Sequence, residues 1–114
     1  MTSPNTQQQV WQLRNLKILE TLIRTGTDLP LMTWTVGPHG MFGEPYNVAG
    51  DSERADAFQR WADALGATPW EPQESNGLTT LRASVKDYNG SGTSIIVRTT
   101  LYGDQEDIST SVDQ

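Results

Sequence analysis

The chain has 114 residues, no cysteine, one histidine and a formal net charge of −6 at pH 7. This composition excludes a disulfide framework, a thiolate nucleophile, a cysteine-ligated metal site and a site with several histidines in one subunit. The negative charge disfavours non-specific nucleic-acid binding, which depends on phosphate neutralisation by lysine and arginine.

The first predicted element is a helix over residues 6–25, preceded by a flexible N-terminus over residues 1–5. On a helical wheel, its large apolar side chains form one wide face that is expected to pack on a sheet: Trp11, Leu16, Ile18, Leu19, Leu22 and Ile23. Val10 and Leu13 lie outside this face and allow a second packing surface.

Two strands are predicted next. Met32, Trp34 and Val36 alternate with threonines, which indicates a half-buried strand over residues 31–36. A turn over residues 37–40 follows, and then a weaker strand over residues 41–47. Because Pro45 cannot donate a hydrogen bond to a neighbouring strand, we expect this second strand to be an edge strand or an irregular return.

The second predicted helix spans residues 52–65, with Asp51 or Ser52 as its N-cap and Gly66 at its end. Phe58, Trp61, Ala62 and Leu65 have helical spacing. This stripe favours core packing over the alternative of a groove ligand. Residues 67–78 are then predicted to be an extended linker, in which Trp70 either folds back as a lid on the core or is exposed for a partner.

The last predicted element is a β-hairpin over residues 79–88 and 93–102. A loop of even length would place Val85 opposite Ile96, on the wrong face of the sheet. We therefore expect Val85 to pair with Ile95 and Ala83 with Val97, through a loop of three or five residues with a left-handed glycine at Gly90 or Gly92.

Together these elements predict an α+β fold, over residues 6–102, that is a two-layer sandwich in the order α-β-β-α-β-β. The sheet is expected to be antiparallel, with both helices on one face. The other sheet face combines basic and aromatic side chains, and with the linker tryptophan it supplies a candidate interaction surface: Trp70, Arg82, Lys86, Tyr88, Ile96, Arg98 and Tyr102.

The C-terminal residues 103–114 carry four acidic residues and no basic one, which leaves a charge of only −2 on residues 1–102. We expect this acidic tail to be disordered, because it has too little apolar surface to offset the entropy of ordering. It serves as a solubilising end, or orders on a basic partner, or folds back over the basic sheet face.

No catalytic constellation and no cofactor-binding or metal-binding motif stands out. His39, in a Gly-Pro-His-Gly turn, is interpreted as a surface residue; a general base or a single metal ligand is its alternative role. We also find no secretory signal and no apolar run of transmembrane length, so we expect a cytoplasmic protein without cofactor or membrane partner.

Three segments carry a resemblance to a family: residues 29–36 (LPLMTWTV), residues 58–67 (FQRWADALGA), and residues 79–83 (TTLRA) continuing to residues 87–93 (DYNGSGT). Over residues 10–104 the chain resembles a group of small uncharacterised proteins of actinobacterial genomes and their mobile elements. The resemblance implies a cytoplasmic accessory protein of a plasmid, phage or integrated element, and it implies no activity and no site residues.

Three functional hypotheses follow. The first is a non-enzymatic interaction protein, either homodimeric or an adaptor, that uses the second sheet face, an edge strand or Trp70. The second is an accessory nucleic-acid-binding protein of a mobile element, in which Arg82, Lys86 and Arg98 contact phosphate. The third is a small ligand-binding protein or enzyme with a pocket near His39 or between the helices and the sheet.

Overall fold

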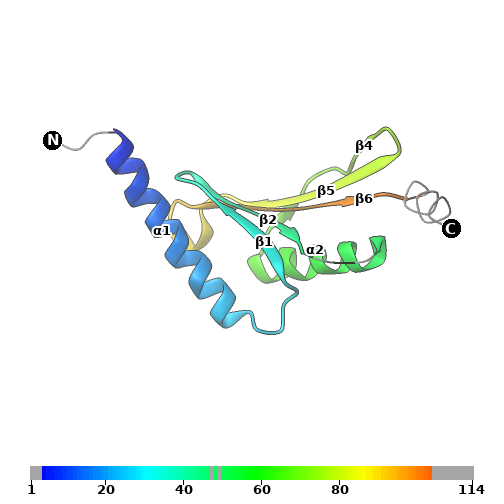
Figure 1. The fold of residues 1–114 in the computed structure, drawn as a ribbon, viewed down its shortest axis with the longest axis horizontal. Helices are drawn as coiled ribbons and strands as arrows, with labels where there is room; N and C mark the ends of the chain where they lie inside the picture. The colour runs from blue at the N-terminus through cyan, green and yellow to red at the C-terminus, as the bar shows by residue number, and fades with distance from the viewer. Residues whose placement is uncertain (1–3, 47, 49, 104–114) are drawn as a thin grey trace.

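The computed structural model describes residues 4–46, 48 and 50–103. It is an α+β fold with two α-helices and a mixed sheet of six strands (Figure 1). The elements are, in chain order, α1 (Pro4–Thr25), β1 (Met32–Val36), β2 (Gly40–Pro45), α2 (Asp51–Leu65), β3 (Thr68–Pro69), β4 (Gln73–Ser75), β5 (Leu78–Val85), the 3₁₀ helix η1 (Tyr88–Gly90) and β6 (Ser94–Leu101).

Two features depart from the expected element order. The predicted linker contains the short strands β3 and β4, which both pair with β5. Helix α1 begins at Pro4, two residues before the predicted start of the helix at residue 6. The predicted acidic tail, from residue 104 onward, lies outside the described residues.

The sheet has the strand order β1-β2-β6-β5-β3, with β4 pairing to β5 beside β3. The expected all-antiparallel sheet is wrong, because β2 and β6 are parallel. Two antiparallel hairpins, β1–β2 and β5–β6, meet along these two strands. The chain passes from β2 through α2 and the short strands β3 and β4 to β5, and the β5–β6 hairpin then reverses it, so that β6 runs parallel to β2.

The parallel pairing also places β2 in the interior of the sheet, so the expectation of an edge strand is wrong. Pro45 is tolerated there because β6 pairs only with Gly40–Gly43, so that Pro45 has a strand partner on the β1 side alone. Gly43 is required by its neighbour: a β-carbon at this position would lie 2.6 Å from Cζ3 of Trp34. Gly43 therefore makes room for the Trp34 ring.

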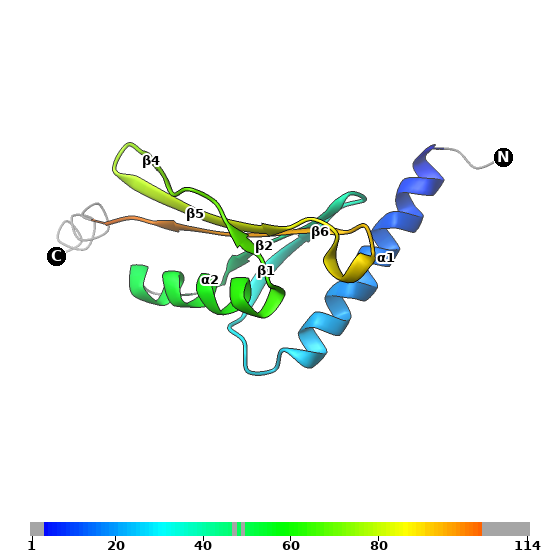
Figure 2. The same cartoon turned by 180° about the vertical axis from the view of Figure 1, so that it is seen from behind.

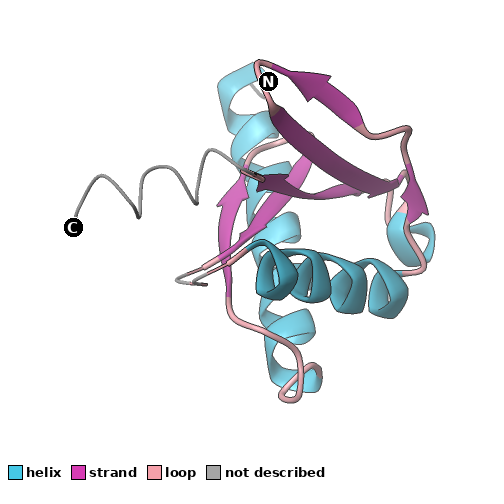
Figure 3. Ribbon diagram, turned by 90° about the vertical axis from the view of Figure 1, so that its right-hand side faces the viewer, coloured by secondary structure: helices cyan, strands magenta, loops and turns pink. Residues whose placement is uncertain are grey.

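Helix α2 covers one face of the sheet, called here the inner face (Figures 1 and 3). The predicted core stripe of α2 is confirmed, since its four residues are all buried. They join the sheet residues Ala83, Ile95 and Val97 in one apolar cluster. The N-cap is Gly50 instead of Asp51 or Ser52, and Gly66 ends the helix in the left-handed conformation with φ of 67°.

Helix α1 runs obliquely along the end of the sheet and contacts β1 and β2 (Figures 1 and 2). The expectation that both helices lie on one face is therefore not confirmed. Because of this oblique course, the buried face of α1 is narrower than the sequence predicts. Leu19 and Leu22 are buried, whereas Leu16 and Ile23 remain 44% and 53% exposed.

The predicted register of the last hairpin is confirmed: Val85 pairs with Ile95 and Ala83 with Val97. The loop is longer than three or five residues, since β5 ends at Val85 and β6 begins at Ser94. Its turn is built around η1, with the carboxylate of Asp87 accepting the N–H of Gly92. The predicted left-handed glycine is present twice, with φ of 74° at Gly90 and 79° at Gly92.

Candidate interaction surfaces

The outer face of the sheet, opposite α2, is the first candidate surface. Its side chains alternate with the buried inner residues along each strand, and the register aligns them across β1, β2, β6 and β5. No helix among the described elements covers this face (Figure 2). Four of the predicted surface residues come together here: Trp70, Arg82, Ile96 and Arg98.

Arg82 and Arg98 are direct partners in the β5–β6 register. Like charges in this relationship are destabilising unless other groups compensate them. The guanidinium of Arg98 donates to Glu44 Oε1 at 2.8 Å and lies 4.5 Å from the ring centre of Phe42. The guanidinium of Arg82 donates to Gln73 Oε1 at 3.3 Å. Arg98 thus has its partners on β2, and Arg82 has its hydrogen-bond partner on β4.

Trp70 adopts the exposed alternative and does not fold back on the core. The residue is 45% exposed, and the centre of its ring lies 5.7 Å from the Arg82 guanidinium. The indole N–H donates to Ser84 Oγ at 2.9 Å, and the backbone N–H of Trp70 donates to the Arg82 carbonyl. The short strand β3, which the sequence analysis missed, brings Trp70 to β5.

The other three predicted surface residues do not join this group. Tyr88 lies in η1 and packs against the core, and Tyr102 lies beyond β6, beneath the Arg54 guanidinium at 4.7 Å. Lys86 is exposed just after the end of β5. Conversely, sequence reasoning missed Phe42 and Glu44, because their contribution to this face requires the parallel pairing of β2 with β6.

The second candidate surface is the exposed apolar face of α1, which we call the α1 stripe: Val10, Leu13, Leu16, Ile23 and, from the loop that follows, Leu31. The exposed fractions of these five residues lie between 44% and 70%. Large apolar side chains that gather on one exposed face mark interaction sites more often than isolated ones do. Val10 and Leu13, for which the sequence allows a second packing surface, are both exposed.

The α1 stripe contains a shallow hollow lined by Leu16, Leu19, Glu20, Ile23 and Arg24. The first four of these residues have the spacing i, i+3, i+4 and i+7. Four residues with this spacing form the hole that receives one side chain of a facing helix in knobs-into-holes packing. Leu13, which is 60% exposed, projects one turn before the hole.

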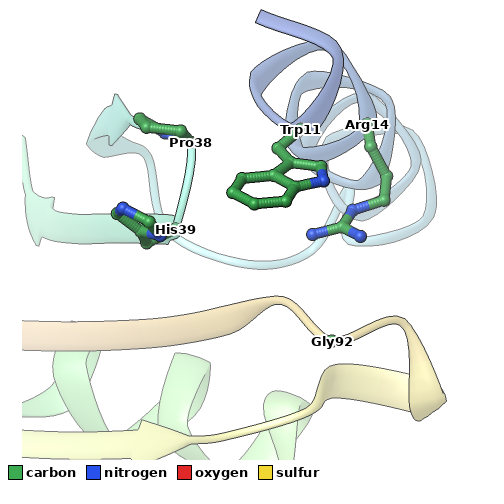
Figure 4. A pocket seen from close by; sticks show the side chains of 5 residues that line it. All are labelled: Trp11, Arg14, Pro38, His39 and Gly92. Atoms are coloured by element: carbon green, nitrogen blue, oxygen red, sulfur yellow. The ribbon is translucent and has the colours of Figure 1, made fainter. Parts of the chain in front are cut away.

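The third candidate is a pocket of about 310 Å³ between α1, the β1–β2 turn and the loop before β6. Trp11, Arg14, Pro38, His39 and Gly92 line it (Figure 4). The rings of Trp11 and His39 lie 6.1 Å apart at an angle of 51°. His39 is exposed, as the sequence predicts for a surface residue, and it also lines a pocket, which is a feature of the third functional hypothesis.

Asp51 is a titratable group with a strongly lowered pKa, and its role is structural. The carboxylate of Asp51 accepts hydrogen bonds from the backbone N–H groups of Tyr102 and Gly103 and from the Arg54 guanidinium. The bond from Tyr102, then those from Arg54 and Gly103, lower the pKa of Asp51 from its ordinary value of 3.8 to about 2. The predicted cap residue thus ties the end of β6 to the start of α2.

Within residues 4–46, 48 and 50–103, no three histidine, aspartate or glutamate side chains gather in a way that could hold a metal ion. Over the same part of the chain, no helix has both the length and the apolar character that crossing a bilayer requires.

Comparison with protein-family models, with curated proteins and with solved structures found no match. The resemblance to actinobacterial and mobile-element proteins therefore stays a prediction.

Proposed function

We propose that this chain is a non-enzymatic interaction protein that forms a homodimer through the α1 stripe. The observation that carries the proposal is the exposure of Leu13, Leu16 and Ile23 on one face of a 22-residue helix. A helix of this length extends for about 33 Å and offers a long contact line. Removing these side chains from water is the main source of association free energy available to the described residues.

The same stripe carries both a projecting side chain and a hole, and this favours a second copy over a different partner. In an antiparallel pair with its two-fold axis near Leu16, Leu13 of one copy enters the hole around Glu20 of the other copy. The symmetry repeats this contact on the other side of the axis, which makes the interface isologous. Arg24 would then lie near the polar residues Gln8 and Gln9 of the second copy.

The outer sheet face supports dimerisation or nucleic-acid binding less well, because its arginines are already satisfied. Arg98 is paired with Glu44, and Arg82 lies against Trp70 and Gln73. A phosphate group would have to replace these partners. The chain also carries six more acidic than basic residues, which opposes the approach of a polyanion.

Sedimentation equilibrium tests the proposal directly. We expect a mass of twice 12.6 kDa for the unmodified chain. Leu13→Gln combined with Leu16→Gln should give a monomer without loss of folding, since both side chains are exposed in one copy. Glu71→Gln, at an exposed position between β3 and β4 and away from α1, is the control and should remain dimeric. A monomeric mass at a concentration of the unmodified chain in the millimolar range would exclude the proposal.

Because the chain has no cysteine, a single introduced thiol reports the symmetry axis. Leu16→Cys places two thiols beside the axis, within reach of a disulfide, which needs α-carbons about 4.4–6.8 Å apart. Arg24→Cys, eight positions away on the same helix, places them far apart. We expect oxidation to link Leu16→Cys into a dimer and to leave Arg24→Cys unlinked. Equal linkage of both variants would contradict the antiparallel arrangement.

A further inference from the structure

The pocket between α1 and the β1–β2 turn contains polar groups that the fold itself does not use. Arg24, Arg54, Arg60, Arg82 and Arg98 each have a hydrogen-bond or ion-pair partner. Arg14 is the only arginine among the described residues without one. The indole N–H of Trp11 and the ring nitrogens of His39 also have no hydrogen-bond partner within the described part of the chain, and both residues line the same pocket.

The walls of the pocket are fixed by a buried contact directly beneath it. Asn15, next to Arg14 on α1, donates to the carbonyl of Gly37 at 2.8 Å and accepts from the hydroxyl of Thr93 at 2.6 Å. These bonds hold α1 against both the β1–β2 turn and the loop before β6. The pocket residues on the three segments are therefore held in place before any ligand binds, which lowers the entropic cost of binding.

The floor of the pocket is open because residue 92 has no side chain. Gly92 has a φ of 79°, and a β-carbon there would lie 4.0 Å from Arg14 Nη1. Figure 4 shows the guanidinium of Arg14 directed into the space between Trp11 and Gly92. A ligand group in this space would contact the guanidinium and the face or edge of the indole ring.

We propose that this pocket binds a small organic anion that has a flat ring. The planar guanidinium of Arg14 binds the oxyanion through charge-assisted hydrogen bonds, a geometry that suits both phosphate and carboxylate. Trp11 and Pro38 supply the apolar contact for the ring, and His39 closes the opposite side. The volume of about 310 Å³ lies at the lower end of small-molecule sites, so the ligand is small. Neither Trp11 nor Arg14 belongs to the α1 stripe, so this inference does not depend on dimerisation.

An NMR titration of the full chain tests the proposal with four probes: phenyl phosphate, benzoate, inorganic phosphate and phenol. We expect saturable shifts of the Trp11 indole N–H and the Gly92 amide with phenyl phosphate or benzoate. Inorganic phosphate lacks the ring and phenol lacks the charge, so each should bind more weakly. Tighter binding of phenyl phosphate than of benzoate assigns a phosphate ester, and the reverse order assigns a carboxylate.

Two arginine variants on the same helix separate this site from general attraction to a basic surface. Arg14→Gln should weaken binding about tenfold or more, which is the effect of losing one charge-assisted hydrogen bond. Arg24→Gln, the matched control, should leave it unchanged. The proposal is overturned if no probe shifts Trp11 and Gly92 saturably, if both variants weaken binding equally, or if the shifts centre on Trp70 instead.

Discussion

The side-chain oxygen of Asn15 accepts a hydrogen bond of 2.6 Å from the hydroxyl of Thr93, 78 positions later in the chain. Neither residue has exposed surface. The amide nitrogen of Asn15 donates to the Gly37 carbonyl. One buried amide thus joins α1 to both loops that border the proposed pocket.

Asn15→Ala should therefore destabilise the fold more than a substitution that removes an exposed hydrogen bond of the same kind. The change leaves the buried Thr93 hydroxyl and the partly buried Gly37 carbonyl without their partner, and a buried group left unpaired costs about 1–3 kcal/mol. We expect a loss of about 2–3 kcal/mol in the free energy of unfolding, measured by urea denaturation. Gln12→Ala is the control, because Gln12 donates to the Val36 carbonyl in an exposed position. An equal loss of unfolding free energy in both variants would contradict the conclusion that the Asn15 side chain makes a buried connection between α1 and the two loops.

Gly43→Ala tests the close approach of Trp34 to β2. The added β-carbon would lie 2.6 Å from the Trp34 ring, so the ring must move within the core. Overpacking of this kind costs about 1–3 kcal/mol. Gly37→Ala provides the comparison, since a β-carbon there would lie 3.9 Å from the carbonyl oxygen of Gly40, which is an ordinary contact distance. Thermal denaturation should separate the two variants, and a similar melting temperature for both would argue against the tight contact.

The lowered pKa of Asp51 predicts that acid destabilises the folded chain through this residue. Its carboxylate has a pKa of about 2 in the folded chain and near the ordinary 3.8 when unfolded, because the folded chain donates three hydrogen bonds to it. Because folding lowers the pKa, the ionised Asp51 carboxylate stabilises the folded chain. This stabilisation is complete above pH 4 and is lost as the pH falls towards 2. Urea denaturation at a series of pH values should show a shallower acid dependence for Asp51→Asn than for the unmodified chain.

Asp56→Asn is the matched control for this effect, because Asp56 is exposed on the same helix. Its acid dependence should resemble that of the unmodified chain. If Asp51→Asn and the unmodified chain have the same slope, the carboxylate does not tie β6 to α2.

The satisfied arginines of the outer sheet face predict that the chain does not bind single-stranded DNA. Arg82 and Arg98 would have to exchange their partners Gln73 and Glu44 for phosphate. Fluorescence anisotropy with a labelled oligonucleotide at low salt should show no binding. Salt-dependent binding that weakens in Arg82→Glu or Arg98→Glu would instead support the nucleic-acid hypothesis.

The sequence by itself determined the two helices, the longer strands and one non-local register. Helical spacing identified the buried stripe of α2, and the position of Gly66 identified its end. The alternation of apolar residues in the last two strands required Val85 to face Ile95, because a shift of one residue would put a charged side chain in the core. These features depend on neighbouring residues or on a single pair of strands.

Only the tertiary structure decided how these elements meet. The parallel pairing of β2 with β6 depends on the path of a long crossover, and it brought Phe42 and Glu44 to Arg98. The oblique course of α1 left Leu16 and Ile23 exposed, although helical periodicity placed them with the buried residues. Periodicity defines which side chains share a face of a helix, whereas the width of the contact is set by the angle at which that helix packs.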